Sequence, residues 1–212
     1  MSAKGASLAL VKELRERTGA GVVDCQKALT ECGGDVEKAI TFLREKGLAA
    51  AAKRAGRSAA QGVVGSYIHG GGKIGVLVEV NCETDFVART EEFQKLVKDV
   101  SMQIAAANPR YVRRDEVSEA ERVREREIYR VQTEQSGKPA AVIDRIVDGK
   151  MEKFFSDICL MEQPFIREPG KTMEQILKEV VAKTGENVVI RRFVRFQIGE
   201  GEGAEAAGGQ SA

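Results

Sequence analysis

Few residues in this chain are of a type and spacing that could carry out chemistry. The one histidine, His69, and the acidic residue Asp85 are the candidates for acid–base catalysis, but neither has a third group nearby in sequence. Three glycines at positions 70–72 could cradle a phosphate. They lack the Gly-Lys-Ser/Thr ending, however, and they join two expected strands rather than a strand and a helix. An enzyme using His69 and Asp85 is therefore one hypothesis, and a binding protein with no catalytic residues is the one that we favour.

The four cysteines predict neither a disulfide framework nor a metal site. Cys25, Cys32, Cys82 and Cys159 form no C-x-x-C pair, and His69 has no metal-type spacing to any of them. We therefore expect reduced thiols in a cytoplasmic protein, with no metal ion and no cofactor.

A mostly polar connection at residues 81–90 lies between an expected strand and an expected helix. The run at 74–80 is short and β-branched, as in a buried strand, and apolar residues recur at helical spacing after position 90. Phe86 lies in this connection. It could be a hydrophobic plug under the following helix, or an exposed wedge presented to a partner. Composition alone favours the plug.

The overall composition argues against several classes of function. There are 33 basic and 32 acidic side chains, a net charge of +1, whereas a dedicated nucleic-acid binder usually has a strong basic excess. Aromatic residues make up 5% and Trp is absent, so base-stacking platforms are not expected. No apolar run is long enough to span a membrane, and the first residues contain no apolar signal core.

The pattern of helices, strands and glycines predicts an α+β chain. We expect a three-helix bundle, a core with a three-stranded antiparallel sheet and helices, and a protruding antiparallel helical hairpin. The expected segments are a helical module at 1–47, a basic linker at 48–61, the α+β core at 62–116 and 167–198, the hairpin with its return loop at 117–166, and a disordered tail at 199–212.

Within the helical segments the sequence predicts particular ends and faces. Ser7 and Asp35 are expected N-caps, and Gly47 is expected to end the third helix. In the hairpin, Ser118 and Glu121 have the spacing of a capping box. The residues expected to face inward are Val22, Cys25, Leu29 and Cys32 in the second helix, and Ala120, Val123, Ile128 and Val131 in the first arm of the hairpin.

Several motifs together resemble the elongation factor Ts family. In the order of that family they are LVKELRERTGAG at 10–21, GSYIHG at 65–70, EVNCETDFVA at 79–88, SGKP at 136–139 and QPF at 163–165. The resemblance covers nearly all of the expected folded chain. It implies a ubiquitin-associated-like N-terminal module, an α+β core and a coiled-coil hairpin. It also implies guanine-nucleotide exchange on elongation factor Tu, in its GDP-bound and nucleotide-free forms, with no covalent chemistry in this chain.

The resemblance also implies where the partner binds. Thr84, Asp85, Phe86 and Val87 correspond to the family's loop that disturbs the partner's magnesium and phosphate site, and this reverses the preference for Phe86 as a plug. His69 corresponds to a contact on the core hairpin. The expected contacts of the N-terminal module are Arg15, Thr18, Gly19, Ala20, Gly21, Val22 and Lys27.

Only one copy of the core repeat is present, whereas long members of the family carry two. Because the strand at 74–80 is apolar at nearly every position, we expect both sheet faces to be buried, one of them in a homodimer. The alternative function is an RNA-associated translation protein that binds through Lys53, Arg54, Arg57 and the arginines of 110–130.

Overall fold

The computed structural model describes residues 7–200, and the chain forms two compact units. The first unit comprises Met1–Gly62, Cys82–Phe93 and Leu177–Val189, and the second comprises Val63–Asn81, Gln94–Ile176 and Ile190–Ala212. Most of the tail expected to be disordered, residues 201–212, lies outside the described residues.

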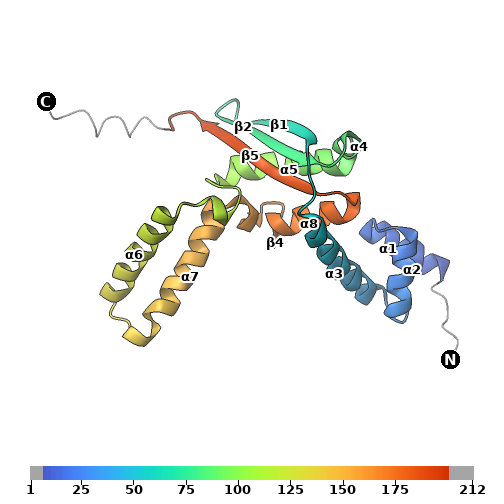
Figure 1. Ribbon diagram of the computed structural model, residues 1–212, viewed down its shortest axis with the longest axis horizontal. Coiled ribbons are helices and arrows are strands. Elements are labelled where there is room, and N and C mark those ends of the chain that lie inside the picture. Colours follow the sequence, from blue (N-terminus) through green and yellow to red (C-terminus); the bar gives the residue numbers. More distant parts are fainter. Residues whose placement is uncertain (1–6, 201–212) are drawn as a thin grey trace. The chain divides into compact units, whose positions relative to one another are not determined.

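Three helices build the N-terminal part of the first unit: α1 (Leu8–Thr18), α2 (Val22–Glu31) and α3 (Val36–Arg54) (Figure 1). Both predicted N-caps form, since Ser7 Oγ accepts from Leu10 N at 3.3 Å and Asp35 Oδ1 accepts from Lys38 N at 3.0 Å. One small core joins the helices. Its fully buried members are Val11, Leu14, Cys25, Ala28, Leu29 and Ala39.

Two expectations for these helices were wrong. Val22 does not face inward but is 44% exposed, because α2 begins there and Ala28 takes the inward position instead. Gly47 does not end α3, which continues to Arg54. The alanines that follow are the strongest helix formers, and they carry the helix through the glycine and into the expected linker. At Gly47 an added Cβ would lie 3.0 Å from Ala182 Cβ, so the glycine permits a close approach to α8 (Met173–Thr184).

Most of the predicted three-stranded sheet belongs to the second unit. The sheet is built from β1 (Gln61–His69), β2 (Ile74–Cys82) and β5 (Val188–Gln197) in the order β1-β2-β5. The glycines at 70–72 close the β1–β2 hairpin, all with positive φ. Ile198 N donates to Lys73 O at 3.0 Å and Arg192 pairs with Glu79. Residue numbers therefore rise along β5 as they fall along β2, and these strands are antiparallel.

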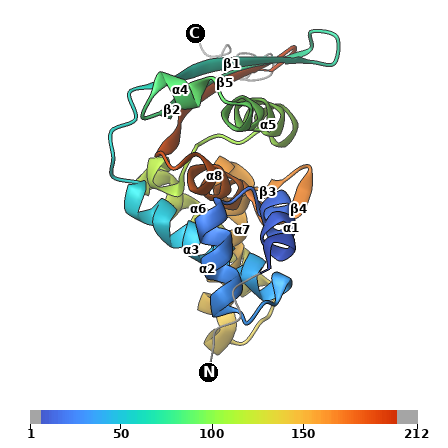
Figure 2. The ribbon, with the colours of Figure 1, turned by 90° about the vertical axis from the view of Figure 1, so that its right-hand side faces the viewer.

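Helix α5 (Glu91–Ala107) lies along one face of the sheet (Figure 2). A Cβ on Gly65 would come within 2.3 Å of Val97 Cγ1, so β1 packs directly on this helix. The buried side chains of β2 and α5 include Val76, Val78, Leu96, Val100 and Ile104.

The other face of the sheet is not covered within the described chain. Only alternate residues of β2 are buried, and Leu77 on the outer face is 48% exposed. In the single chain this strand is therefore buried on one face only, and the expected burial of its second face by another copy stays a prediction. The large apolar side chains exposed on β1, β2, β5 and the residue after β5 are Val64, Ile68, Leu77, Val194, Phe196 and Ile198.

The helical hairpin consists of α6 (Glu119–Gln135) and α7 (Ala140–Ile158). Ion pairs join Arg126 to Asp148 at 2.6 Å and Arg130 to Asp144 at 2.9 Å. A step of four residues up α6 thus matches a step of four down α7, which makes the pair antiparallel.

The inward face predicted for α6 was wrong, because Val123, Ile128 and Val131 are exposed. Ser118 does cap α6, accepting from Glu121 N at 3.2 Å. The Glu121 carboxylate instead accepts a hydrogen bond from the Tyr111 hydroxyl and pairs with Arg110. The apolar cluster at the base of the hairpin comes mainly from α7. Its buried members are Val117, Val147, Met151, Phe154, Phe155 and Cys159.

The expected return loop is partly a small antiparallel ribbon of β3 (Pro164–Phe165) and β4 (Glu168–Thr172), which follows the short helix η2 (Leu160–Glu162). A further short helix, η1 (Arg114–Glu116), precedes α6. Buried polar groups of α5 hold the ribbon. Gln103 donates to Gln163 and accepts from Ile166 N, and Asp99 pairs with Arg167 at 2.9 Å.

Candidate partner-binding surface

The connection after β2 is fixed by a carboxylate from a distant part of the sequence. Glu186 Oε2 accepts hydrogen bonds from the backbone N–H groups of Glu83, at 3.1 Å, and Thr84, at 3.0 Å. Glu186 Oε1 accepts from Thr84 Oγ1 at 2.6 Å. Three donors on two successive residues converge on one side chain, and hydrogen bonds to an ionised acceptor are among the stronger ones in proteins.

A second set of bonds runs in the opposite direction. Glu83 Oε1 accepts from Asn187 N at 2.6 Å and lies 3.5 Å from Arg57 Nη1. The Asn187 amide donates to Arg57 O at 2.7 Å. Residues 83–84 and 186–187 are therefore bound reciprocally. We call this set of bonds the loop clamp.

The clamp holds the start of a single helical turn, α4 (Asp85–Ala88). Thr84 is its N-cap and accepts from Val87 N at 3.4 Å, while Asp85 pairs with Arg89 at 2.7 Å. Ala88 is buried and anchors the turn, whereas Phe86 is 79% exposed. The plug interpretation of Phe86 was wrong: its ring lies in solvent on a rigidly held backbone.

The turn between α1 and α2 brings together the residues expected on the N-terminal module. Gly19 ends α1 with φ of 69°, a conformation that favours glycine, and its N–H bonds to Arg15 O at 2.8 Å. Thr18 Oγ1 donates to Leu14 O and accepts from Ala20 N. The side chains of Arg15, Val22 and Lys27 are exposed around this turn.

Lys183 of α8 lies close both to the α1–α2 turn and to Glu92, which follows the α4 turn. A Cβ added to Gly19 would lie 3.7 Å from Lys183 Cε, and Lys183 Nζ lies 3.4 Å from Glu92, shortly after the clamped loop. The α1–α2 turn and the α4 turn belong to the same compact unit. Two of the three predicted contact regions are thus parts of one folded body.

His69 belongs to the other unit, at the end of β1. Its ring stacks on Tyr67 with centroids 5.8 Å apart, and Nδ1 is 3.0 Å from the Tyr67 hydroxyl. The side chain is exposed, and the tyrosine fixes its orientation. This geometry suits a surface contact.

The arginines of the RNA hypothesis are mostly neutralised by carboxylates. Arg110 lies 2.7 Å from Glu121, and Arg57 lies near Glu83. Pairs already described hold Arg126 and Arg130 on the hairpin. Nucleic-acid binding needs cations that are free to contact phosphates, so this pairing argues against the hypothesis.

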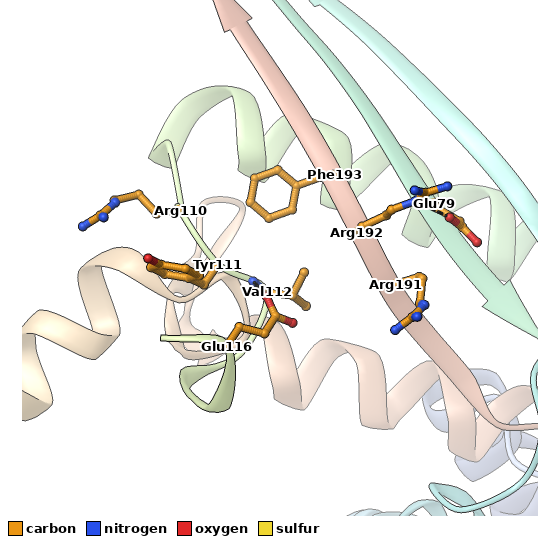
Figure 3. Close-up of a pocket in the computed structure, with 8 residues that line it drawn as sticks. All are labelled: Glu79, Arg110, Tyr111, Val112, Glu116, Arg191, Arg192 and Phe193. Carbon is orange, nitrogen blue, oxygen red and sulfur yellow. Dashed lines mark hydrogen bonds and ion pairs between the residues drawn. The ribbon is translucent and has the colours of Figure 1, made fainter. Parts of the chain in front are cut away.

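A cleft in the second unit contains further arginines (Figure 3). Arg192 Nε lies 2.8 Å from Glu79. In Figure 3, Arg110 and Arg191 lie at opposite ends of the group, and the Arg110 side chain points away from the other labelled residues. Hydrogen bonding by Tyr111, helped by a hydrogen bond and the positive charge of Arg110, lowers the pKa of Glu121. The eight lining residues are Glu79, Arg110, Tyr111, Val112, Glu116, Arg191, Arg192 and Phe193.

All four cysteines are free thiols. Burial raises the pKa of Cys159 to about 11 and also raises that of Cys82. In the described part of the chain, residues 7–200, no cluster of His, Cys, Asp and Glu side chains has the composition of a metal site. Over the same residues, no helix combines the length and apolarity needed to cross a membrane.

Comparison with known proteins identifies one family. Residues 26–200 match the family described as Elongation factor TS. Elongation factor Ts of Desulforamulus reducens is 62% identical over 195 residues, covering 92% of this chain and 90% of that protein. The protein of the same name from Caldanaerobacter subterraneus subsp. tengcongensis is 63% identical over 191 residues, covering 90% and 96%. This chain therefore belongs to the elongation factor Ts family, whose members serve protein biosynthesis as guanine-nucleotide exchange factors.

Sequence reasoning missed the residues that hold the loop. Lys183, Glu186 and Asn187 all fell within the expected α+β core at 167–198, and no role was predicted for any of them. Nothing local marks Glu186 as an acceptor for residues about a hundred positions earlier. A signal was present only for Thr84, which is an N-cap residue type followed, after Asp85, by a short apolar run.

Proposed function

We propose that this chain promotes GDP release from elongation factor Tu during translation elongation, in the cytoplasm where translation takes place. One observation carries the proposal. A phenylalanine, Phe86, is 79% exposed on a turn whose backbone is held by the loop clamp. Leaving a large aromatic side chain in water forgoes the free energy of burying it, and a partner's surface can recover that energy.

The proposed mechanism is differential binding. Phe86, with Asp85 and Val87 beside it and Thr84 holding the turn, inserts next to the partner's magnesium and phosphate site and displaces groups that hold the metal. The metal neutralises phosphate charge, so moving its ligands weakens the hold on GDP. By linkage, GDP and this chain then weaken each other's binding by the same factor. No bond is made or broken by this chain, and it requires no cofactor.

The clamp contributes through preorganisation. A loop that is already in its binding conformation does not lose backbone entropy at the moment of association, a cost of about 1–2 kcal/mol for each residue ordered. The exposed ring and the rigid backbone together support the proposal that Phe86 anchors a partner protein.

The N-terminal turn is proposed as a second contact, on the nucleotide-binding domain of the partner. Val22 supplies exposed apolar area, and the exposed side chains of Arg15 in α1 and Lys27 in α2 supply positive charge. Thr18, Gly19, Ala20 and Gly21 shape the turn. His69, held by Tyr67, is proposed as a separate contact on the sheet hairpin.

We also propose that the outer face of the sheet is covered by the same face of a second copy. Six large apolar side chains are exposed there, and exposed apolar patches of this kind mark interaction surfaces. A two-fold pair of sheets would bury them. Light scattering on the chain alone at micromolar concentration should give twice 23.1 kDa, and Phe196→Glu should give 23.1 kDa. A wild-type monomer across that range would refute the dimer.

The test of the proposed function is a release assay. Elongation factor Tu is loaded with fluorescent GDP, an excess of unlabelled GDP is added, and the signal is followed with and without this chain. We expect catalytic amounts of the chain to accelerate release. Unchanged release at concentrations well above that of the partner would reject the function.

A further inference from the structure

The two edges of the sheet differ in how they are protected against pairing. Edge strands have unpaired backbone N–H and C=O groups, and proteins usually block them with charges, prolines or short length. β5, at one edge, carries Arg191, Arg192 and Arg195. β1, at the other edge, runs for nine residues, QGVVGSYIH, with no charged residue and no proline. The β1 edge is therefore open to pairing with another strand.

A groove lies beside this open edge, with a volume of about 650 Å³. One wall is the central part of β1, residues 63–67, and the other is the first half of α5. The two walls meet at Gly65, which lets β1 approach α5 closely, because an added Cβ would lie 2.3 Å from Val97 Cγ1. An extended chain entering the groove would run along β1 at the usual separation of about 4.7–4.9 Å between strands.

The charges on the helix wall indicate what kind of segment would bind. Lys95 and Lys98 line the groove, are exposed, and have no ion-pair partner among residues 7–200. Asp99 also lines the groove, but Arg167 neutralises it at 2.9 Å. The groove thus has two free positive charges and no free negative charge.

The spacing of these lysines matches that of a strand. Side chains three residues apart on a helix lie about 5–6 Å apart, and alternate side chains on one face of a strand lie about 6.5–7 Å apart. Two acidic side chains at alternate positions of an added strand could therefore each reach one lysine. Main-chain hydrogen bonds to β1 would supply the rest of the binding, as in β-strand addition.

We propose that β1 and α5 form a docking groove for an extended, acidic segment of a partner protein, which adds to the sheet as a fourth strand. This surface is separate from the Phe86 loop, and the proposal does not depend on the exchange activity. The groove runs along the edge of the sheet, and of the six apolar side chains on the outer face assigned to the dimer it shares only Val64.

The probes are two labelled nonapeptides, one alternating Thr or Val with Glu and the other alternating Thr or Val with Lys. We expect the acidic peptide to bind at micromolar to millimolar concentration and the basic one at least tenfold more weakly. N-methylation of alternate residues of the acidic peptide removes the N–H groups on one side, and we expect methylation of the side that faces β1 to abolish binding. Amide hydrogen exchange should show new protection in Gln61–His69.

Protein variants complete the test. Lys95→Glu/Lys98→Glu should lose the acidic peptide and gain the basic one, a reversal that misfolding cannot produce. Lys138→Glu, an exposed lysine in the hairpin turn, is the matched control and should behave as wild type. Absence of peptide binding would overturn the proposal. So would binding that tolerates N-methylation on both sides, or protection of β1 by a second copy of the chain instead of the peptide.

Discussion

The loop clamp can be tested by removing its acceptor with Glu186→Ala. This change deletes the partner of three donors: the N–H groups of Glu83 and Thr84, and the Thr84 hydroxyl. A hydrogen bond to a charged group contributes about 1.5–3 kcal/mol when buried. The clamp is only partly buried, and water can reach the freed donors, so we expect a loss of about 2–3 kcal/mol in the free energy that holds the loop.

This loss has two measurable consequences. At 1.4 kcal/mol for each factor of ten, the open loop becomes about 30- to 140-fold more populated relative to the clamped one. Hydrogen exchange at the Glu83 and Thr84 amides should accelerate by that factor. The rate of labelled-GDP release from elongation factor Tu, measured at sub-saturating concentrations of this chain, should decrease. Glu186→Gln, which keeps one acceptor oxygen, should lie between the alanine variant and wild type.

Glu168→Gln is the matched control, because it removes an exposed carboxylate that pairs with Lys171 on the ribbon, away from the clamp. We expect it to change neither the rate of hydrogen exchange at the Glu83 and Thr84 amides nor the rate of GDP release. If Glu186→Ala loosens the amides but GDP release is unaffected, the clamp is not needed for function. If the amides remain protected, the hydrogen bonds of Glu186 do not hold the loop.

Three further predictions address other parts of the chain. Val22→Asp should weaken binding to elongation factor Tu by about tenfold or more in a titration, with an unchanged circular dichroism spectrum, because the side chain is exposed at the N-terminal turn. In native protein at pH 8, iodoacetamide followed by mass spectrometry should modify Cys32 well before Cys159, whose burial raises its pKa to about 11. Tyr111→Phe should lower the free energy of unfolding at neutral pH. That deficit should shrink as pH falls below 4.5, because the lowered pKa of Glu121 contributes stability only while the carboxylate is ionised.

Local signals predicted the secondary structure well. Ser7, Asp35 and Ser118 each cap the helix expected after them, and the glycines at 70–72 form the expected hairpin turn. These features depend on residues a few positions apart, so a short window of sequence contains the information.

Features that depend on tertiary contacts could not be predicted in the same way. Gly47 reads as a helix end, yet the helix continues because alanines follow it and α8 packs closely against it. The apolar residues of α6 resemble a buried face, but α7 supplies most of the hairpin's core. The exposure of Phe86 depends on a bond network whose acceptor, Glu186, lies about a hundred residues away. Composition alone favoured the opposite interpretation, and only the family resemblance indicated the exposed one.

The central claim is that Phe86 acts in the complex and not in the fold, and Phe86→Ala tests it most directly. The two quantities to compare are the rate of labelled GDP release from elongation factor Tu and the melting temperature of the variant, with Val123→Ala as a control at another exposed apolar position. Losing a central aromatic anchor costs about 2 kcal/mol or more, so we predict about 30-fold slower stimulated release. Because the ring is 79% exposed, we expect a shift of about 2 °C or less in melting temperature. Release at the wild-type rate, or a melting temperature that collapses together with activity, would contradict the account.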